Sequence, residues 1–138
     1  MKALLFGTAR IPSLAANIGL TALRVFAGFS LMYAHGLGKM PPSEGFIQGA
    51  ANMGFPMPWL FGWAAALSET VGGVLMAIGL ATRPAALFVA CTVGTAAFVR
   101  HAADPYARKE LALLFFFTAV LFLCTGGGRF SLDRLIQK

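Results

Sequence analysis

Long apolar stretches occupy most of the chain, and short polar breaks separate them. The stretches cover about residues 14–38, 59–80, 83–102 and 109–126. A helix needs roughly 20 residues to cross the hydrocarbon core of a bilayer, and about 17 suffice where polar ends reach the headgroups. The buried helices of a soluble bundle would also carry a charged outer face, and these stretches lack one. The pattern therefore predicts four membrane-spanning helices.

Glycine and proline residues mark the ends of these stretches. Gly36 and Gly38 lie at the end of the first stretch and Pro41-Pro42 follow it, and Asp104-Pro105 separates the third from the fourth. Neither Gly nor Pro favours a helix interior. Thr82-Arg83-Pro84 is predicted to join the second helix to the third, since Pro is favoured at a helix start.

Two shorter helices are predicted at the membrane surface. One starts near Ser43-Glu44 in the first loop, and the other covers residues 132–137 after a cap at Ser131. The expected fold class is all-α: an integral membrane four-helix bundle with short interfacial helices in the first loop and at the C-terminus. Residues 1–138 are expected to form a single domain.

Composition agrees with a membrane protein. Of the 138 residues, 58% are apolar and only 12% are charged, about half the charged share of soluble domains. The net charge of +6 comes from single Lys and Arg residues at the edges of apolar stretches. Because they form no basic stripe, the lipid bilayer is expected as partner and nucleic acid is not.

The distribution of cations predicts an orientation. Four spans place both termini on one side, together with six cations, whereas the other side carries four. The positive-inside rule therefore favours a multi-pass protein of the cell (inner) membrane with both termini in the cytoplasm. The six cations are Lys2, Arg10, Arg83, Arg129, Arg134 and Lys138, and the four are Lys39, Arg100, Arg108 and Lys109.

Arg24 and Glu69 are ionisable residues inside apolar stretches. Inserting an ionised side chain at the bilayer centre costs about 2.5 kcal/mol or more, so each of these residues is expected to have a structural or functional role. Arg24 lies about 16 Å along the helix from His35, and Glu69 about 15 Å from Trp59. Antiparallel neighbours would bring the two charges to one depth. The sequence predicts an Arg24–Glu69 pair, which either fixes helix register or forms a charged pocket.

Small residues surround Glu69 on one face of its helix. Such a face lets neighbouring backbones approach closely, so it is predicted to point into the bundle, with Gly73 against the first helix. The residues at helical offsets from Glu69 are Gly62, Ala65, Ala66, Gly72, Gly73 and Met76.

Further polar residues collect at the rim away from the termini. His35, Lys39, His101 and Glu110 come from the ends of the first, third and fourth stretches. Histidines there can titrate near neutral pH. With Arg24 and Glu69 they form a candidate intramembrane polar pocket. No metal is expected, since the HxxxH and ExxH spacings of metal sites are missing.

The two cysteines are interpreted as packing residues. Cys91 and Cys124 lie in separate apolar stretches without a CxxC spacing, and a free Cys behaves as a small buried apolar group. No haem, flavin or metal motif is visible, so the cofactor is unknown, with a quinone as the candidate.

Several segments together resemble the DoxX family of small four-helix membrane proteins. The resemblance runs from about Leu23 to Leu135, and Gly127 departs from it where relatives often carry Pro. The segments are Leu23-Arg24, His35-Gly36-Leu37-Gly38-Lys39, Glu69-Thr70-Val71-Gly72-Gly73, Leu75, Gly79-Leu80-Ala81-Thr82-Arg83, His101, Glu110 and Gly126-Gly127-Gly128-Arg129-Phe130-Ser131-Leu132-Asp133.

The resemblance implies two classes of function. Name-giving members of the family are associated with terminal oxidase and thiosulfate:quinone oxidoreductase systems. One hypothesis is therefore a redox-linked, quinone-associated accessory subunit that works with a soluble or membrane oxidoreductase. The alternative is a non-enzymatic membrane protein, either a small-solute carrier or an assembly or stress factor. Enzymatic activity and a homo-oligomeric state stay open from the sequence.

Overall fold

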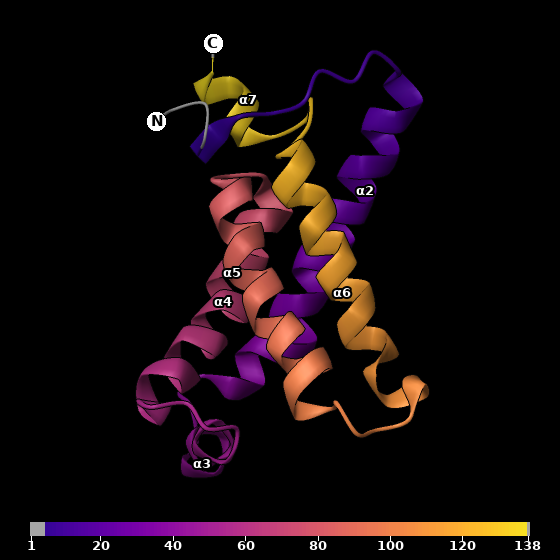
Figure 1. Ribbon diagram of the computed structural model, residues 1–138. Helices are drawn as coiled ribbons and strands as arrows, with labels where there is room; N and C mark the ends of the chain where they lie inside the picture. Colours follow the sequence, from indigo (N-terminus) through magenta and orange to yellow (C-terminus); the bar gives the residue numbers. More distant parts are fainter. Residues whose placement is uncertain (1–4, 138) are drawn as a thin grey trace.

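The computed structural model describes residues 5–137, and helices make up most of this part (Figure 1). No strand occurs among these residues, which confirms the all-α class. The first long segment consists of α2 (Leu14–Ser30) followed by η1 (Leu31–Gly36) and η2 (Leu37–Lys39). The second is α4 (Pro58–Ile78), and the third consists of α5 (Thr82–Thr95) followed by η3 (Ala96–Arg100). The fourth is α6 (Tyr106–Thr125). The short helices are α3 (Glu44–Asn52) and α7 (Leu132–Ile136).

The long helices run up and down between two ends of the molecule (Figure 1). At the terminal end, α2 begins, α4 turns into α5, and α7 follows α6. At the loop end lie η2, α3 and the connection from η3 to α6. The backbone N–H of Ala9 donates to the carbonyl of Thr125 (2.7 Å), which ties the N-terminal segment to the end of α6.

Three helical segments of the described chain are long and apolar enough to cross a membrane: Leu14–Lys39, Pro58–Ile78 and Thr82–Arg100. Helix α6 has a similar length of 20 residues. Its first turns carry Arg108, Lys109 and Glu110. With these three charges, α6 is not apolar enough to count among the helices that could cross a membrane. The all-helical membrane fold is thus established, whereas the fourth span stays a prediction.

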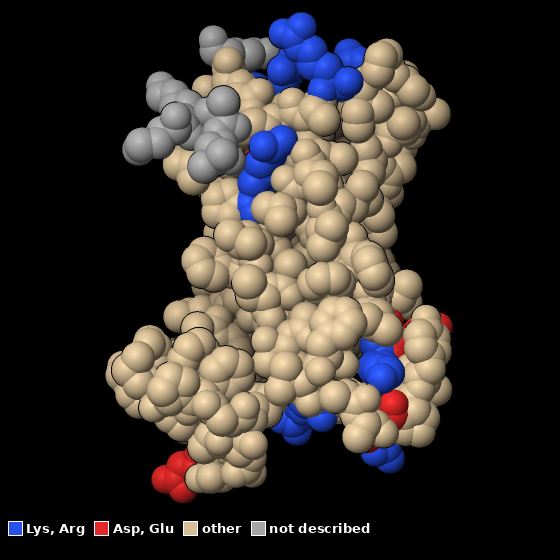
Figure 2. All heavy atoms as spheres, viewed as in Figure 1, with Lys and Arg blue, Asp and Glu red and all other residues tan. Residues whose placement is uncertain are grey.

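The burial pattern is that of a protein surrounded by lipid. The interior is rich in small residues such as Ala66, Ala86 and Ala119, which are fully buried. Large apolar side chains point outward instead; Phe26 is 70% exposed and Phe117 is 63% exposed. Lys and Arg side chains gather at both ends of the visible face, and the middle is free of charge (Figure 2).

Glycines bring α2 and α4 into backbone contact. A Cβ on Gly28 would lie 2.5 Å from the carbonyl oxygen of Gly73 and 2.6 Å from the backbone nitrogen of Ala77. A Cβ on Gly73 would in turn lie 2.8 Å from the carbonyl oxygen of Gly28. The small face of α4 therefore meets the first helix, as the sequence predicts, because only glycine permits this distance.

Arg24 joins three segments at the terminal end. Its guanidinium donates hydrogen bonds to the carbonyls of Met76 (2.8 Å) and Ala77 (3.0 Å) at the end of α4, and to the carbonyl of Phe130 (2.8 Å). The last carbonyls of a helix lack partners within the helix and carry the negative end of its dipole. Arg24 donates to the Ala77 carbonyl and adds a second donor to that of Met76, which also accepts from the N–H of Gly79, although Arg24 is only 2% exposed.

Asp133 completes this arrangement from the start of α7. Its fully buried carboxylate accepts hydrogen bonds from the backbone N–H groups of Ala81 (2.7 Å) and Thr82 (2.9 Å), where α5 begins. Its own N–H donates to the carbonyl of Gly79 (2.8 Å). The C-terminal segment thereby caps α5, since a carboxylate is favourable at a helix N-terminus. Arg24 and Asp133 together lock the turn between α4 and α5.

Cations occupy both ends of the molecule. Arg83 at the start of α5 donates to the carbonyl of Cys124 (3.0 Å) near the end of α6, at the terminal end. Arg100 and Arg108 lie at the opposite end, on η3 and α6. Lys2 and Lys138, which also enter the predicted charge bias, lie outside the described residues. The side of the membrane that each end faces stays a prediction.

Candidate functional site

A cavity of about 750 Å³ lies at the loop end, between η1, η2, α3, α4, α5, η3 and α6. Its walls are mostly apolar and include Leu31, Phe46, Phe61, Phe88 and Phe115. Its ionisable lining residues are His35, Lys39, Glu69, Arg100, His101 and Arg108. Binding sites for small molecules combine apolar walls with a few polar groups in this way.

Both π-helical segments of the described chain border this cavity. Leu31 and His35 reach it from η1, and Ala96 and Arg100 reach it from η3. A π turn adds a residue to a helix and is common at functional sites. Within η1, His35 contacts the ring of Phe115 edge-on at 5.5 Å between ring centroids.

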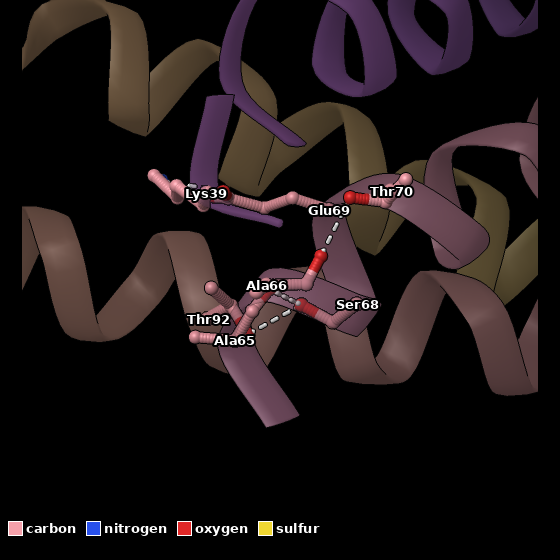
Figure 3. A network of polar contacts seen from close by, with 7 residues as sticks. All are labelled: Lys39, Ala65, Ala66, Ser68, Glu69, Thr70 and Thr92. Atoms are coloured by element: carbon pink, nitrogen blue, oxygen red, sulfur yellow. Dashed lines mark hydrogen bonds and ion pairs between the residues drawn. The ribbon is translucent and has the colours of Figure 1, made fainter. Parts of the chain in front are cut away.

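Lys39 and Glu69 form an ion pair in the cavity wall (Figure 3). The Glu69 side chain is 6% exposed, and that of Lys39 is 30% exposed. Lys39 also lies over the ring of Phe46 from α3, at 5.4 Å from the ring centroid. The pair connects the buried middle of α4 to the end of the first helix, and it compensates the charge of Glu69 inside an apolar wall.

Hydroxyl groups on both sides of Glu69 hold its helix in place (Figure 3). The hydroxyls of Ser68 and Thr92 share a hydrogen bond of 2.6 Å, which links α4 to α5. Thr70 donates to the carbonyl of Ala66 (2.8 Å) within α4. Gly36 packs against Thr70, where a Cβ would lie 2.8 Å from the Thr70 Cα. Glu69 is therefore fixed by α5 on one side and by η1 on the other.

A second ion-pair group lies at the mouth of the cavity, where η3 leads into α6. Nδ1 of His101 lies 2.7 Å from Asp104, and Arg108 lies 3.8 Å from the same carboxylate. The hydrogen bond with His101 and the charge of Arg108 hold the pKa of Asp104 below its ordinary value. Asp104 is therefore ionised at neutral pH and partly compensates the charge of Arg108.

The structure brings together four of the six predicted pocket residues. His35, Lys39, Glu69 and His101 all line the cavity. Arg24 lies at the terminal end, bonded to backbone carbonyls. Glu110 is exposed on α6 and does not belong to the lining.

The predicted Arg24–Glu69 pair is wrong, because the first loop shifts α4 relative to α2. Residues 40–57 fold back as α3, which packs on the first turns of α4; Ile47 lies 3.2 Å from where a Gly62 Cβ would be. The end of the first helix, Lys39, is therefore level with Glu69, well inside α4. Arg24 is level with Met76, about 10 Å further along α4.

The sequence prediction also missed parts of the site. Asp104 pairs with His101 and Arg108 at the mouth, and Arg108 lines the cavity, although neither Asp104 nor Arg108 was among the predicted pocket residues. The π turns carry no recognisable sequence signal. Cys91 and Cys124 are exposed rather than buried packing residues, and Cys91 lies in the cavity wall. Among residues 5–137, no group of three or more His, Cys, Asp or Glu side chains could hold a metal ion.

Replacing Lys39 by Met is expected to lower the free energy of unfolding by about 2–3 kcal/mol, because Glu69 would stay buried without a cation. The loss is smaller than the 3–5 kcal/mol of fully buried pairs, since Lys39 is 30% exposed. Adding Glu69→Gln should recover much of the loss. Unfolding in detergent measures all three variants, with Lys109→Met as a control of equal charge change. Equal destabilisation by Lys39→Met and Lys109→Met would contradict the pair.

Comparison with known proteins identifies the family. The DoxX family model matches residues 19–102. The chain is 33% identical to "Putative oxidoreductase CatD" of Bacillus subtilis (strain 168), over 88% of this chain and 90% of that protein. It is 32% identical to "Inner membrane protein YphA" of Escherichia coli (strain K12), over 94% of both chains. No solved structure matches. The chain therefore belongs to the DoxX family of membrane proteins.

Proposed function

We propose that this protein is a membrane subunit of an oxidoreductase system, and that the cavity at the loop end binds a membrane quinone. The observation that carries the proposal is a cavity of about 750 Å³ with apolar walls and with Lys39, Glu69, His35 and His101 in its lining. The name of the CatD relative, "Putative oxidoreductase CatD", supports the same class.

The residues present fit a quinone. A volume of about 750 Å³ lies within the roughly 300–1,000 Å³ of typical ligand sites. The aromatic residues Phe46, Phe61 and Phe115 provide flat apolar surface for a ring. Lys39 offers N–H donors for a carbonyl oxygen, and the two histidines can donate or accept, depending on tautomer.

A bound quinone would supply two-electron chemistry coupled to protons. The residues of this chain would position the ring and exchange protons with it. Glu69 is the proposed proton-exchanging residue, because it is buried in the cavity wall and its carboxylate contacts Lys39, which is partly exposed. We assign the electron source to a partner subunit, since the sequence contains no CxxC, haem or flavin motif of its own.

We also propose four spans in the cell (inner) membrane, with both termini in the cytoplasm. The name of the YphA relative supports the inner membrane, and the six-to-four bias of cations supports the orientation. The cavity would then face the outer side of this membrane. A reporter fused after Lys138 should be active only if it is a cytoplasmic marker, and a signal from a periplasmic marker would reverse this orientation.

A soluble quinone analogue such as decylubiquinone is expected to slow maleimide labelling of Cys91 in detergent-solubilised protein. Cys91 lies in the cavity wall, and Cys124, which does not, serves as internal control. Mass spectrometry of peptides measures both labelling rates in the same sample. Equal protection of both cysteines, or none, would contradict a quinone in this cavity and would favour a non-enzymatic membrane protein.

Glu69→Gln tests the role of the carboxylate in this site. The variant is expected to weaken protection of Cys91 by the analogue, because the charge that holds Lys39 in the wall is lost. Glu110→Gln removes an equal charge at the same end, from an exposed residue outside the lining. Protection that is equal in the two variants would contradict a role for Glu69 in binding.

A further inference from the structure

Three cationic residues line the cavity at the loop end, and two of them already contact carboxylates. Lys39 is paired with Glu69, and Arg108 lies near Asp104, which also binds His101. Arg100 forms no ion pair within residues 5–137. Apart from the histidines, these three cations and two carboxylates leave one positive charge, and Arg100 carries it.

Arg100 reaches beneath α3 at the mouth of the cavity. It is the last residue of η3, and its Nη1 lies 3.3 Å from where a Cβ on Gly49 would be. The guanidinium therefore lies against the backbone of α3, at a position where that helix has no side chain. Arg100 is exposed and also lines the cavity, so its guanidinium is accessible to a ligand at the mouth.

The apolar wall continues from this mouth to the outer surface of the bundle. Phe88, which is 63% exposed, and Cys91 line the cavity from α5, and Phe61 lines it from α4 while being 37% exposed. These residues belong to helices that are long and apolar enough to lie in the membrane. An apolar chain could therefore enter the cavity sideways from the bilayer.

We propose that this cavity binds an anionic amphiphile, whose phosphate or carboxylate group contacts Arg100 and whose apolar chain occupies the aromatic wall. The planar guanidinium matches both anions with two parallel hydrogen bonds. The anion would compensate the remaining positive charge of Arg100, which is exposed at the mouth of the cavity. This goes beyond the quinone site, since a quinone is neutral. The two ligands would compete for the same volume.

The test compares lipids that differ only in headgroup charge. Native mass spectrometry and thermal unfolding of the full chain in detergent measure binding of phosphatidylglycerol and of phosphatidylcholine with identical acyl chains. We expect adducts and stabilisation with phosphatidylglycerol only. Arg100→Gln should weaken this binding about tenfold or more, as expected for loss of a charged hydrogen bond. Lys109→Gln, which removes the same charge outside the lining, should leave binding unchanged.

Three outcomes would overturn the proposal. They are equal binding of the two lipids, equal loss in Arg100→Gln and Lys109→Gln, and stabilisation by inorganic phosphate alone that matches the lipid. The last would assign Arg100 to free anions rather than to an amphiphile. Arg100→Lys keeps the charge but loses the paired donors, and is expected to bind with intermediate affinity.

This proposal and the quinone proposal can fail separately. Protection of Cys91 by decylubiquinone is measured without added lipid, in the natural chain and in Arg100→Gln. If protection persists while phosphatidylglycerol shows no dependence on Arg100, only the anionic site fails. If protection is absent in the natural chain while the lipid binds through Arg100, only the quinone site fails.

Discussion

Replacing Arg24 by Met is expected to lower the free energy of unfolding by about 3–5 kcal/mol, because buried carbonyls would lose a charged hydrogen-bond donor. The carbonyls of Ala77 and Phe130 would lose the Arg24 donor, and the Met76 carbonyl would keep only its bond from the N–H of Gly79 (3.1 Å). The buried carboxylate of Asp133 would also lose a nearby positive charge. Thermal or chemical unfolding in detergent measures the loss.

Two comparisons make this result specific. Arg129→Met removes an exposed charge at the same end and is expected to change stability by less than about 0.5 kcal/mol. Adding Glu69→Gln to Arg24→Met should give no recovery, because the two residues bond to different partners and their effects should add. Recovery of stability in that double variant would support the Arg24–Glu69 pair predicted from the sequence and contradict the contacts described above.

Replacing Gly28 by Ala is expected to destabilise the protein by about 3 kcal/mol, at the upper end of overpacking effects. The new Cβ would lie 2.5 Å from the Gly73 carbonyl oxygen and 2.6 Å from the Ala77 nitrogen. Both are backbone atoms of α4, so no side chain can rotate away and the two helices must separate. Unfolding in detergent measures the loss of stability.

Gly19→Ala is the matched control in the same helix. No atom lies within 4 Å of a Cβ at this position, so the variant should be neutral or more stable by about 0.5–1 kcal/mol through helix propensity. Equal stability of the Gly28 and Gly19 variants would contradict the close approach of α2 and α4.

The polar residues at the two ends of the molecule have different kinds of partner. At the terminal end, Arg24 and Asp133 use backbone groups as partners and leave the turn between α4 and α5 fixed. At the loop end, π turns in both the first helix and η3 open space that aromatic and ionisable side chains line. The terminal end therefore serves stability, and the loop end holds the candidate site.

Much of the fold could be predicted from the sequence, because the relevant signals are local. Runs of apolar residues that match the bilayer thickness predict the long helices. Ser43 and Ser131 predict the starts of α3 and α7, and each accepts a backbone N–H at the helix start it caps. The small face around Glu69 predicts the contact of α4 with α2, since close packing of membrane helices requires small side chains.

The partners of the buried charges were decided only by the tertiary structure. A rise of 1.5 Å per residue predicts depth within one helix, but it does not predict how far a neighbouring helix is shifted. The folding of α3 onto α4 moves Glu69 level with Lys39 instead of Arg24. The cavity likewise depends on π turns and on aromatic residues from several helices. Hydropathy and local spacing along one chain carry no information about such relative shifts, so only the packed structure determines which polar residues meet.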